Sequence, residues 1–205
     1  MTIQSTNMQP TLLEIEIHTV TSVESSYRTI ATMALAFSQD PAARWLFPDS
    51  SDFTKNFSEF VQAFAGKSFA QESAFYTDDF TGSALWLGPD VSGDEEAVIS
   101  LISERVPEDR LDETFAVFSQ MDEFHPEFPH WYLPLIGVDP IHHGKGHGSA
   151  LLRHVLKECD RTGIPAYLES SSPANIPLYE RHGFNVIGEI QAGNSPVIYP
   201  MLRPG

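Results

Sequence analysis

Three glycines stand at alternate positions where an apolar strand gives way to a helix. The stretch "VDPIHHGKGHGSALLRHVLKECD" begins at Val138 and contains Gly144, Gly146 and Gly148, with Lys145 beside them. Glycines there leave backbone N–H groups bare, and the start of a helix carries free donors and a partial positive charge. The pattern therefore favours a loop that binds phosphate.

Familiar nucleotide-binding and metal-binding motifs fit this loop less well. The P-loop pattern G-x-x-x-x-G-K-[ST] is absent, and the spacing G-x-G-x-G differs from the dinucleotide fingerprint G-x-G-x-x-G. A glycine can also serve only to let a strand pack closely against a helix. That explanation would suffice for a single glycine, but it fits three alternating glycines less well. His143 and His147 lie four residues apart, but no H-E-x-x-H motif and no adjacent carboxylate completes a ligand set, so we expect no metal.

Two segments together resemble the GNAT acetyltransferase superfamily. The loop "VDPIHHGKGHGSALL" is similar to the acyl-CoA-binding motif [QR]-x-x-G-x-[GA], with His143 where Gln or Arg is usual and Gly146 and Gly148 at the two small positions. The segment "NIPLYERHGF", residues 175–184, is similar to a second signature of the family. A weaker likeness through "ALAFSQDPAARWLFPDS" resembles the branch that contains puromycin N-acetyltransferase.

The resemblance implies acetyl-CoA as co-substrate and points to the residues that bind it. The loop amides would hold the pyrophosphate, and the preceding strand would pair with the pantetheine arm as a peptide adds to a sheet edge. In the family two parallel strands splay apart here, and Pro134 is compatible with such an interrupted ladder. The expected binding residues are Ile136, Gly137, Val138, His143, Gly144, Lys145, Gly146, His147, Gly148, Ser149 and Asn175.

The implied reaction is direct attack of a primary amine on the acetyl thioester in a ternary complex. An alkyl ammonium of pKa about 10.4 costs about 4.6 kcal/mol to deprotonate at pH 7, so a base is needed. Glu169, on the strand beside the expected cleft, is the first candidate, and His130 or a water is the alternative. The resemblance places Tyr179 where it protonates or hydrogen-bonds the departing thiolate.

Composition narrows the class of partner. The 205 residues are 41% apolar and 20% charged, which is typical of a globular domain. A net charge of −16 argues against nucleic acid or an anionic membrane and favours a cationic small-molecule amine or polyamine over an anionic acceptor, and a peptide N-terminus or a lysine side chain fits equally. One cysteine, Cys159, leaves no internal disulfide, and neither a membrane span nor a signal pattern is present, so we expect a cytoplasmic protein.

The first half of the chain must supply the elements around this site. We expect a disordered segment at 1–10 and a single N-acetyltransferase domain at 11–205. The pattern predicts a strand at 12–20 and then a helix, with Thr21 and Glu24 as its capping box. Its predicted apolar stripe is Tyr27, Ile30, Ala34 and Phe37, and a second helix carries Phe53, Phe57, Phe60 and Phe64. A hairpin around Asp78–Gly82 and helices at 93–104 and 107–123 follow.

The second half predicts the fold class. A strand at 130–138, a helix at 146–160 and a strand at 164–171 form a crossover with parallel strands. A short helix at 175–182 ends at Gly183, and a hairpin around "QAGN" closes the chain. The pattern itself predicts one domain with a mixed sheet. The resemblance implies an α+β (mixed α/β) GNAT fold, with a mixed, mostly antiparallel sheet of about seven strands and a parallel βαβ core that binds acetyl-CoA.

Two other functions stay open on the sequence alone. A non-catalytic acyl-CoA-binding or sensing module would keep the glycine loop without needing Tyr179. An acyltransferase that acts on a hydroxyl or uses a longer acyl donor would carry the same motifs. Neither the acceptor nor the oligomeric state is predicted.

Overall fold

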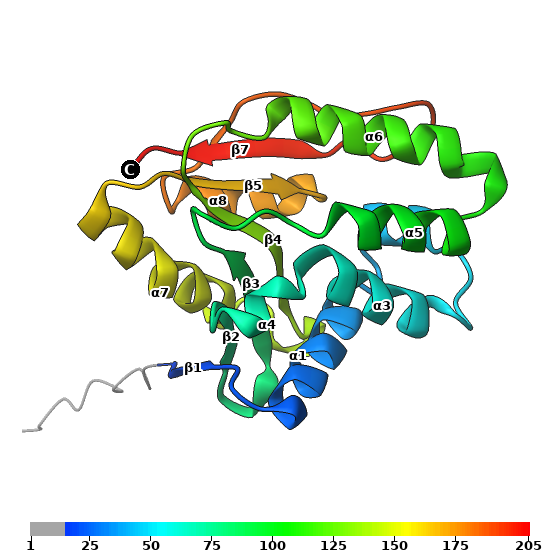
Figure 1. Ribbon diagram of the computed structural model, residues 1–205. Coiled ribbons are helices and arrows are strands. Elements are labelled where there is room, and N and C mark those ends of the chain that lie inside the picture. Colours follow the sequence, from blue (N-terminus) through cyan, green and yellow to red (C-terminus); the bar gives the residue numbers. More distant parts are fainter. Residues whose placement is uncertain (1–14) are drawn as a thin grey trace, which may run out of the picture.

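The strands pair into one sheet that runs through the molecule. The computed structural model describes residues 15–205 (Figure 1). The sheet has the order β1-β2-β3-β4-β5-β7-β6, and only the pair β4–β5 is parallel. The strands are β1 (Ile17–Thr19), β2 (Ala74–Thr77), β3 (Gly82–Leu87), β4 (Trp131–Val138), β5 (Ala166–Ser170), β6 (Asn185–Val186) and β7 (Tyr199–Arg203). The predicted mixed, mostly antiparallel sheet is confirmed.

Helices cover both faces of this sheet. They are α1 (Val23–Ala36), α2 (Pro41–Leu46), α3 (Phe53–Ala65), α4 (Lys67–Ala70), α5 (Glu95–Arg105), α6 (Leu111–Phe124), α7 (His147–Thr162) and α8 (Ile176–Glu180), with short 3₁₀ turns η1 (Asp78–Phe80), η2 (Glu108–Arg110), η3 (Pro140–His142) and η4 (Pro173–Asn175). In Figure 1, α7 lies on one side of β2–β4, and α1 and α3 lie on the other.

Each face has its own apolar core. One core joins α1, α3 and α5 to the sheet through residues such as Met33, Phe57 and Ile102. The other packs α7 against the opposite face through Leu151 and Leu152, which are fully buried. Burying such a side chain contributes roughly 1.5–3 kcal/mol, so the two cores fix the helices on either side of β4.

The strands β4 and β5 separate part-way along their length. Their parallel pairing covers only Trp131–Leu133 against Ala166–Leu168. Beyond Leu133, no strand among residues 15–205 pairs with that edge of β4, although β3 pairs with its other edge as far as Val138. Pro134 lies at the point of separation and lacks an N–H, so it cannot continue the ladder. The interrupted ladder with which Pro134 is compatible is therefore present.

The N-terminal predictions need three corrections. Of the strand predicted at 12–20, only Ile17–Thr19 pairs within the described residues; residues 1–14, including the segment expected to be disordered, lie outside them. Thr21 and Glu24 do not form the capping box. Ser22 is the N-cap, because its backbone is extended and its Oγ accepts from the Ser25 N–H at 3.1 Å while Ser25 Oγ accepts from the Ser22 N–H at 3.1 Å.

The apolar stripe predicted for α1 is wrong at Tyr27. That side chain is 70% exposed, whereas Thr29 and Met33 are fully buried. The buried face follows the close contact of α1 with β4, where an added Cβ on Gly137 would lie 2.6 Å from Ala36 Cβ. Hydrophobicity at a helical spacing did not distinguish this face from the neighbouring one.

Candidate functional site

A cavity of about 510 Å³ lies along the unpaired part of β4 and the start of α7. All of the expected cofactor-binding residues except Lys145, which is exposed, line it: Ile136, Gly137, Val138, His143, Gly144, Gly146, His147, Gly148, Ser149 and Asn175. We call it the cofactor cavity. It is built mainly from residues 136–149, with further lining from η4, α8 and the segment at the end of α1.

The glycine loop presents free backbone donors to this cavity. Gly144 has φ 74° and Gly146 has φ 92°, a left-handed conformation that side chains disfavour. Gly146 is the N-cap of α7, and no described side chain caps the helix. The first intrahelical hydrogen bond runs from the Ala150 N–H to Gly146 O at 2.9 Å. The N–H groups of residues 147–149 are therefore available to a ligand.

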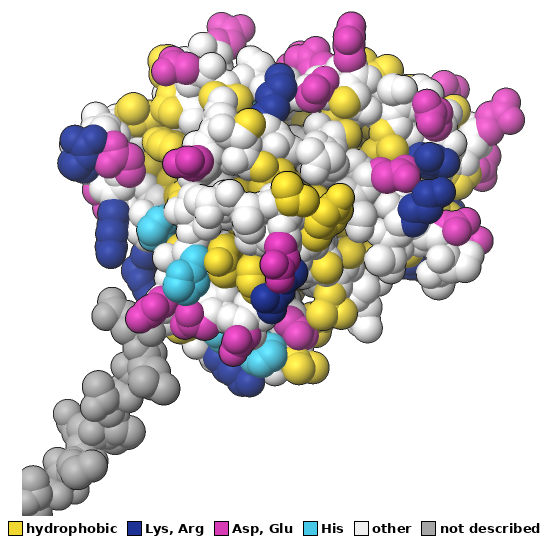
Figure 2. Space-filling view, turned by 60° about the horizontal axis from the view of Figure 1, so that its bottom comes forward, with side chains coloured by type: hydrophobic (Ala, Val, Ile, Leu, Met, Phe, Trp, Pro, Cys, Tyr) yellow, Lys and Arg dark blue, Asp and Glu magenta, His cyan; other side chains and the backbone are white. Residues whose placement is uncertain are grey.

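Positive charge gathers beside the loop of an otherwise acidic chain. Arg181 lines the cofactor cavity, and Arg153 Nη1 donates to Ser149 Oγ at 3.2 Å. Burial, and then the nearby arginines, lower the pKa of His182, so its neutral Nε2 can accept from Ser149 Oγ at 2.5 Å. Figure 2 shows how widely acidic side chains are spread over one face of the molecule. The local cations make the loop suited to an anion.

A second cavity, of about 110 Å³, lies between α2, α3, α6 and the gap between β4 and β5. Its walls are mainly aromatic and aliphatic. We call it the acceptor cavity. The two cavities meet, because both are lined by Phe37, Asp40, Ile136, Asn175 and Tyr179. These five residues define the junction, where a group bound in one cavity would reach a group bound in the other.

Tyr179 lies at the junction as the sequence predicts. It is carried by α8 and is 6% exposed. Burial first, and the Asp40 carboxylate second, raise the pKa of Tyr179 well above its usual value of 10. The hydroxyl therefore keeps its proton at neutral pH and can donate a hydrogen bond.

Asp40 is a junction residue that the sequence analysis missed. It is the N-cap of α2, where its Oδ1 accepts from the Ala43 N–H at 3.0 Å. Its Oδ2 accepts from Ser171 Oγ at 2.5 Å. Burial raises the pKa of Asp40, against the effect of these hydrogen bonds. The sequence "QDPAARW" indicates a helix cap; its second partner, Ser171, could not be found from local spacing.

Glu169 lines the acceptor cavity but not the cofactor cavity. Its side chain is half-buried on β5 with Oε1 out of contact with solvent. Removal of the carboxyl from water raises its pKa to about 7, although the nearby hydroxyls of Tyr132 and Tyr167 act in the opposite direction. Among the described residues, none forms a hydrogen bond of normal geometry with Glu169 Oε1. A carboxyl that titrates near neutral pH can both take and release a proton there.

Comparison with known proteins identifies the family. The model of the acetyltransferase (GNAT) family matches residues 37–184, which is most of the chain. The chain belongs to the GNAT acetyltransferase family. As a GNAT protein it is an acyltransferase of the N-acetyltransferase class.

Individual relatives of this GNAT chain agree in class and fold. An uncharacterised N-acetyltransferase of Schizosaccharomyces pombe is 28% identical over 178 residues, which span 77% of this chain and 69% of that protein. A structure from Corynebacterium glutamicum, named as histone acetyltransferase HPA2 and related acetyltransferase, has a TM-score of 0.68 at 24% identity, over 94% of this chain and 98% of that one. The polyamine N-acetyltransferase of Drosophila melanogaster has a TM-score of 0.63 at 11% identity, over 93% and 100%.

His130, the alternative base, lines neither of the two cavities that the described residues form. It is buried beside α6, where its Nδ1 bonds Phe128 O at 2.8 Å and its Nε2 lies 3.1 Å from His125 Nε2. Burial lowers the pKa of both histidines, that of His125 to about 4. The pair is neutral at physiological pH and packs against Tyr167.

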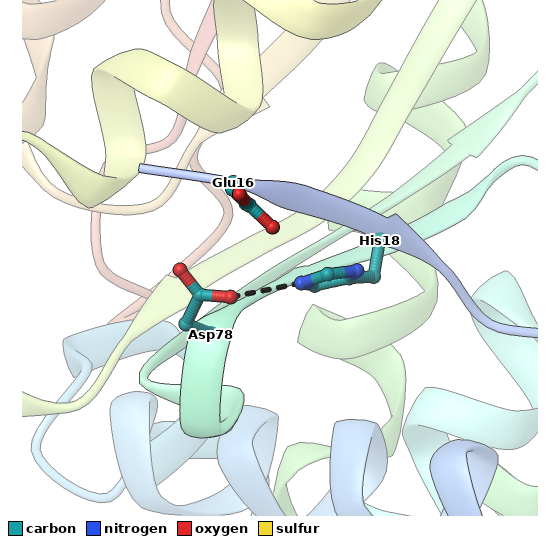
Figure 3. Close-up of side chains that lie close together, drawn as sticks. All are labelled: Glu16, His18 and Asp78. Carbon is teal, nitrogen blue, oxygen red and sulfur yellow. Dashed lines mark hydrogen bonds and ion pairs between the residues drawn. The ribbon is translucent and has the colours of Figure 1, made fainter. Parts of the chain in front are cut away.

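Within residues 15–205, one group of three side chains could hold a metal ion. Glu16, His18 and Asp78 place one potential ligand atom each within 4.8 Å of the others. Figure 3 shows that they face one another between β1 and the turn after β2, with His18 Nε2 2.8 Å from Asp78 Oδ1. The group lies on the surface and lines neither cavity, so it has no part in the site described above.

None of the helices formed by the described residues has both the length and the apolar character needed to cross a bilayer.

Proposed function

We propose that this GNAT protein transfers the acetyl group of acetyl-CoA to a primary amine of a small molecule, by direct attack in a ternary complex. The observation that carries the proposal is the meeting of two cavities at Asp40 and Tyr179. One cavity has uncapped helix amides for an anionic cofactor, and the other has apolar walls with a carboxyl at each of two positions.

The cofactor cavity suits coenzyme A in three parts. The N–H groups of residues 147–149 would bind the pyrophosphate, each charge-assisted bond contributing roughly 1.5–3 kcal/mol. The unpaired edge of Ile136–Val138 would hydrogen-bond the pantetheine amides. Asn175 and Tyr179, at the junction of the two cavities, would then lie beside the thioester.

The acceptor amine must lose a proton before it attacks. The nitrogen forms a bond to the acetyl carbon, the carbon–sulfur bond breaks, and the thiolate leaves. Asp40 lines both cavities, so it would bind the ammonium and is the base that we place first. Glu169, the first candidate from the sequence, lines only the acceptor cavity and is the alternative base, with its pKa near 7. Tyr179 would donate a hydrogen bond to the sulfur as negative charge develops there.

Some proteins that share this fold are named for small amine acceptors. Solved structures with this fold include arylalkylamine N-acetyltransferase 2 of Aedes aegypti, at 12% identity and a TM-score of 0.64, and the Drosophila polyamine enzyme. At such identities the likeness concerns the fold, and the acceptor has to be found by assay. The likeness to the puromycin N-acetyltransferase branch rests on sequence motifs, so puromycin belongs in the panel.

The wider proposals concern the whole chain. We propose that residues 11–205 form one N-acetyltransferase domain. We also propose a cytoplasmic location, because a single cysteine that is buried in α7 fits a reducing compartment.

The deciding experiment follows acetylated product by mass spectrometry, with acetyl-CoA and a panel of primary amines and alcohols. Amine-dependent product with matching release of coenzyme A is expected, and Asp40→Asn should lower kcat/KM by at least about tenfold. Tight coenzyme A binding by calorimetry without turnover on any amine would favour an acyl-CoA sensor. Product from alcohols alone would favour the hydroxyl acyltransferase.

A further inference from the structure

An unbroken row of aromatic rings leads away from the junction. Phe37 stacks on Phe57 with ring centroids 5.1 Å apart, and Phe57 lies 5.8 Å from Phe60. Phe60 stacks on Phe64 at 5.1 Å, and Phe64 meets the edge of Phe118 at 6.2 Å. All five rings line the acceptor cavity. The row therefore starts at the point of acetyl transfer and forms one wall of the acceptor cavity.

Three elements build this row. Phe57, Phe60 and Phe64 recur on α3 at intervals of three and four, so they share one face of the helix. Phe37 follows the end of α1, and Phe118 comes from α6. Rings from separate elements that stack in sequence form a rigid apolar wall, since aromatic pairs at these separations attract each other.

The cavity offers little to a second positive charge. Among the described residues that line it, none is Lys or Arg, and the carboxyls are Asp40 and Glu169. Asp40 is at the junction, where the reacting amine must lie. A second ammonium would have Glu169 as its carboxyl partner, in surroundings where burying a charge is costly.

The volume also limits the acceptor. The acceptor cavity holds about 110 Å³. A dry cavity of about 150 Å³ lined by Leu, Ile and Phe side chains is known to bind benzene, so the space here suits a group of about one ring. A long, hydrated polyamine chain has no comparable match in this wall.

We propose that the acceptor is a primary amine joined by a short chain to one aromatic ring or an apolar group of that size. Its ring lies against the row Phe57–Phe60–Phe64–Phe118, and its amine lies at Asp40. The inference rests on the proposed acetyltransferase function and names its substrate class. It differs from the expectation drawn from net charge. The acidic surface attracts any cation, whereas the apolar wall of the cavity favours an amine that carries an aromatic or other apolar group.

A set of matched amines tests the proposal. kcat/KM is measured for 2-phenylethylamine, n-hexylamine and 1,5-diaminopentane, which reach similar distances and differ in the far end. We expect kcat/KM to be highest for 2-phenylethylamine, lower for n-hexylamine and lowest for 1,5-diaminopentane, with at least about a tenfold difference between the first and the last. A diamine that equals or exceeds 2-phenylethylamine would overturn the proposal.

A pair of variants locates the effect. Phe118→Ala should lower kcat/KM for 2-phenylethylamine by about tenfold and change that for ethylamine little, because ethylamine is too short to reach the ring. Phe69→Ala, at a half-buried phenylalanine of α4 outside the cavity, is the matched control and should preserve the ratio of the two substrates. Equal losses for both substrates in Phe118→Ala would contradict the proposed position of the ring.

Binding separates this proposal from the proposed function. The same amines are titrated by calorimetry into the protein saturated with coenzyme A. If no amine is acetylated but 2-phenylethylamine binds at least about tenfold more tightly than the diamine, the transferase function fails and the cavity's selectivity stands. If no amine binds, or the diamine binds best, the acceptor class proposed here is wrong.

Discussion

At the scale of single residues, Glu169 combines a half-buried side chain, whose Oε1 is out of contact with solvent, with a pKa near neutrality. Its pKa is raised from 4.5 to about 7, so the folded protein holds a proton that the unfolded chain releases earlier. The stability that this proton confers is complete below pH 4.5 and is lost as the pH rises to about 7. At 1.36 kcal/mol per unit, the loss is about 3 kcal/mol.

Glu169→Gln should remove this dependence. We expect the free energy of unfolding of the variant to increase by about 3 kcal/mol relative to that of wild type between pH 4.5 and pH 8, so that the variant becomes the relatively more stable protein. Urea unfolding at several pH values measures the difference, which also cancels the opposite effect of His125, whose lowered pKa of about 4 removes stability below pH 6.5. Parallel curves for the two proteins would mean that Glu169 titrates normally.

Tyr179 allows a second test at this scale. Tyr179→Phe removes the hydroxyl and keeps the ring, so kcat should fall at least about tenfold while the Kd for coenzyme A stays the same. Tyr76→Phe is the control, because Tyr76 is half-buried on β2 and lines neither cavity of the described residues. Unchanged kcat in Tyr179→Phe would exclude a role at the sulfur.

At the scale of elements, two glycines on either side of the α7 helix have similar backbone conformations. Gly144, in the loop, has φ 74°, and Gly163, after the helix, has φ 69°; a Cβ added to either would have no described atom within 4 Å. Alanine at each should therefore cost a similar amount of stability, roughly 1 kcal/mol. The difference between the two positions is the cavity that Gly144 lines.

Calorimetry with coenzyme A uses this match. Gly144→Ala should weaken binding by about tenfold, because its methyl group occupies the approach of the pyrophosphate to the loop amides. Gly163→Ala should bind as wild type does. Equal affinities in the two variants would show that Gly144 serves the conformation of the loop rather than the ligand.

The same scale explains what could be predicted from sequence. The cofactor cavity is lined mainly by two short stretches, residues 136–149 and 175–181, so the spacing of glycines and the short helix after β5 indicated it. The acceptor cavity depends on how α1, α3 and α6 pack, and local spacing carries no such information. Phe57, Phe60 and Phe64 were predicted to share a helix face, but Asp40 was missed because its partner Ser171 lies far away in sequence.

At the scale of the whole molecule, the net charge of −16 affects how fast a charged substrate reaches the protein. The field of an acidic protein raises the local concentration of a cationic amine, and salt screens it, since the Debye length falls from about 30 Å at 0.01 M to about 10 Å at 0.1 M. We expect kcat/KM for a cationic amine to fall a few-fold over this range. An amine that is uncharged at the assay pH is the control, and an equal fall for both would exclude steering.

The hydrogen bond between Ser171 and Asp40 joins residues 131 positions apart. During synthesis the ribosome releases Asp40, α3 and β4 well before β5 and the serine that follows it. Until then β4 has a bare edge, which invites pairing with other chains. A chain that is truncated before β5 would therefore be inactive and prone to aggregate. The junction between the two cavities forms only after β5 and Ser171 have been synthesised.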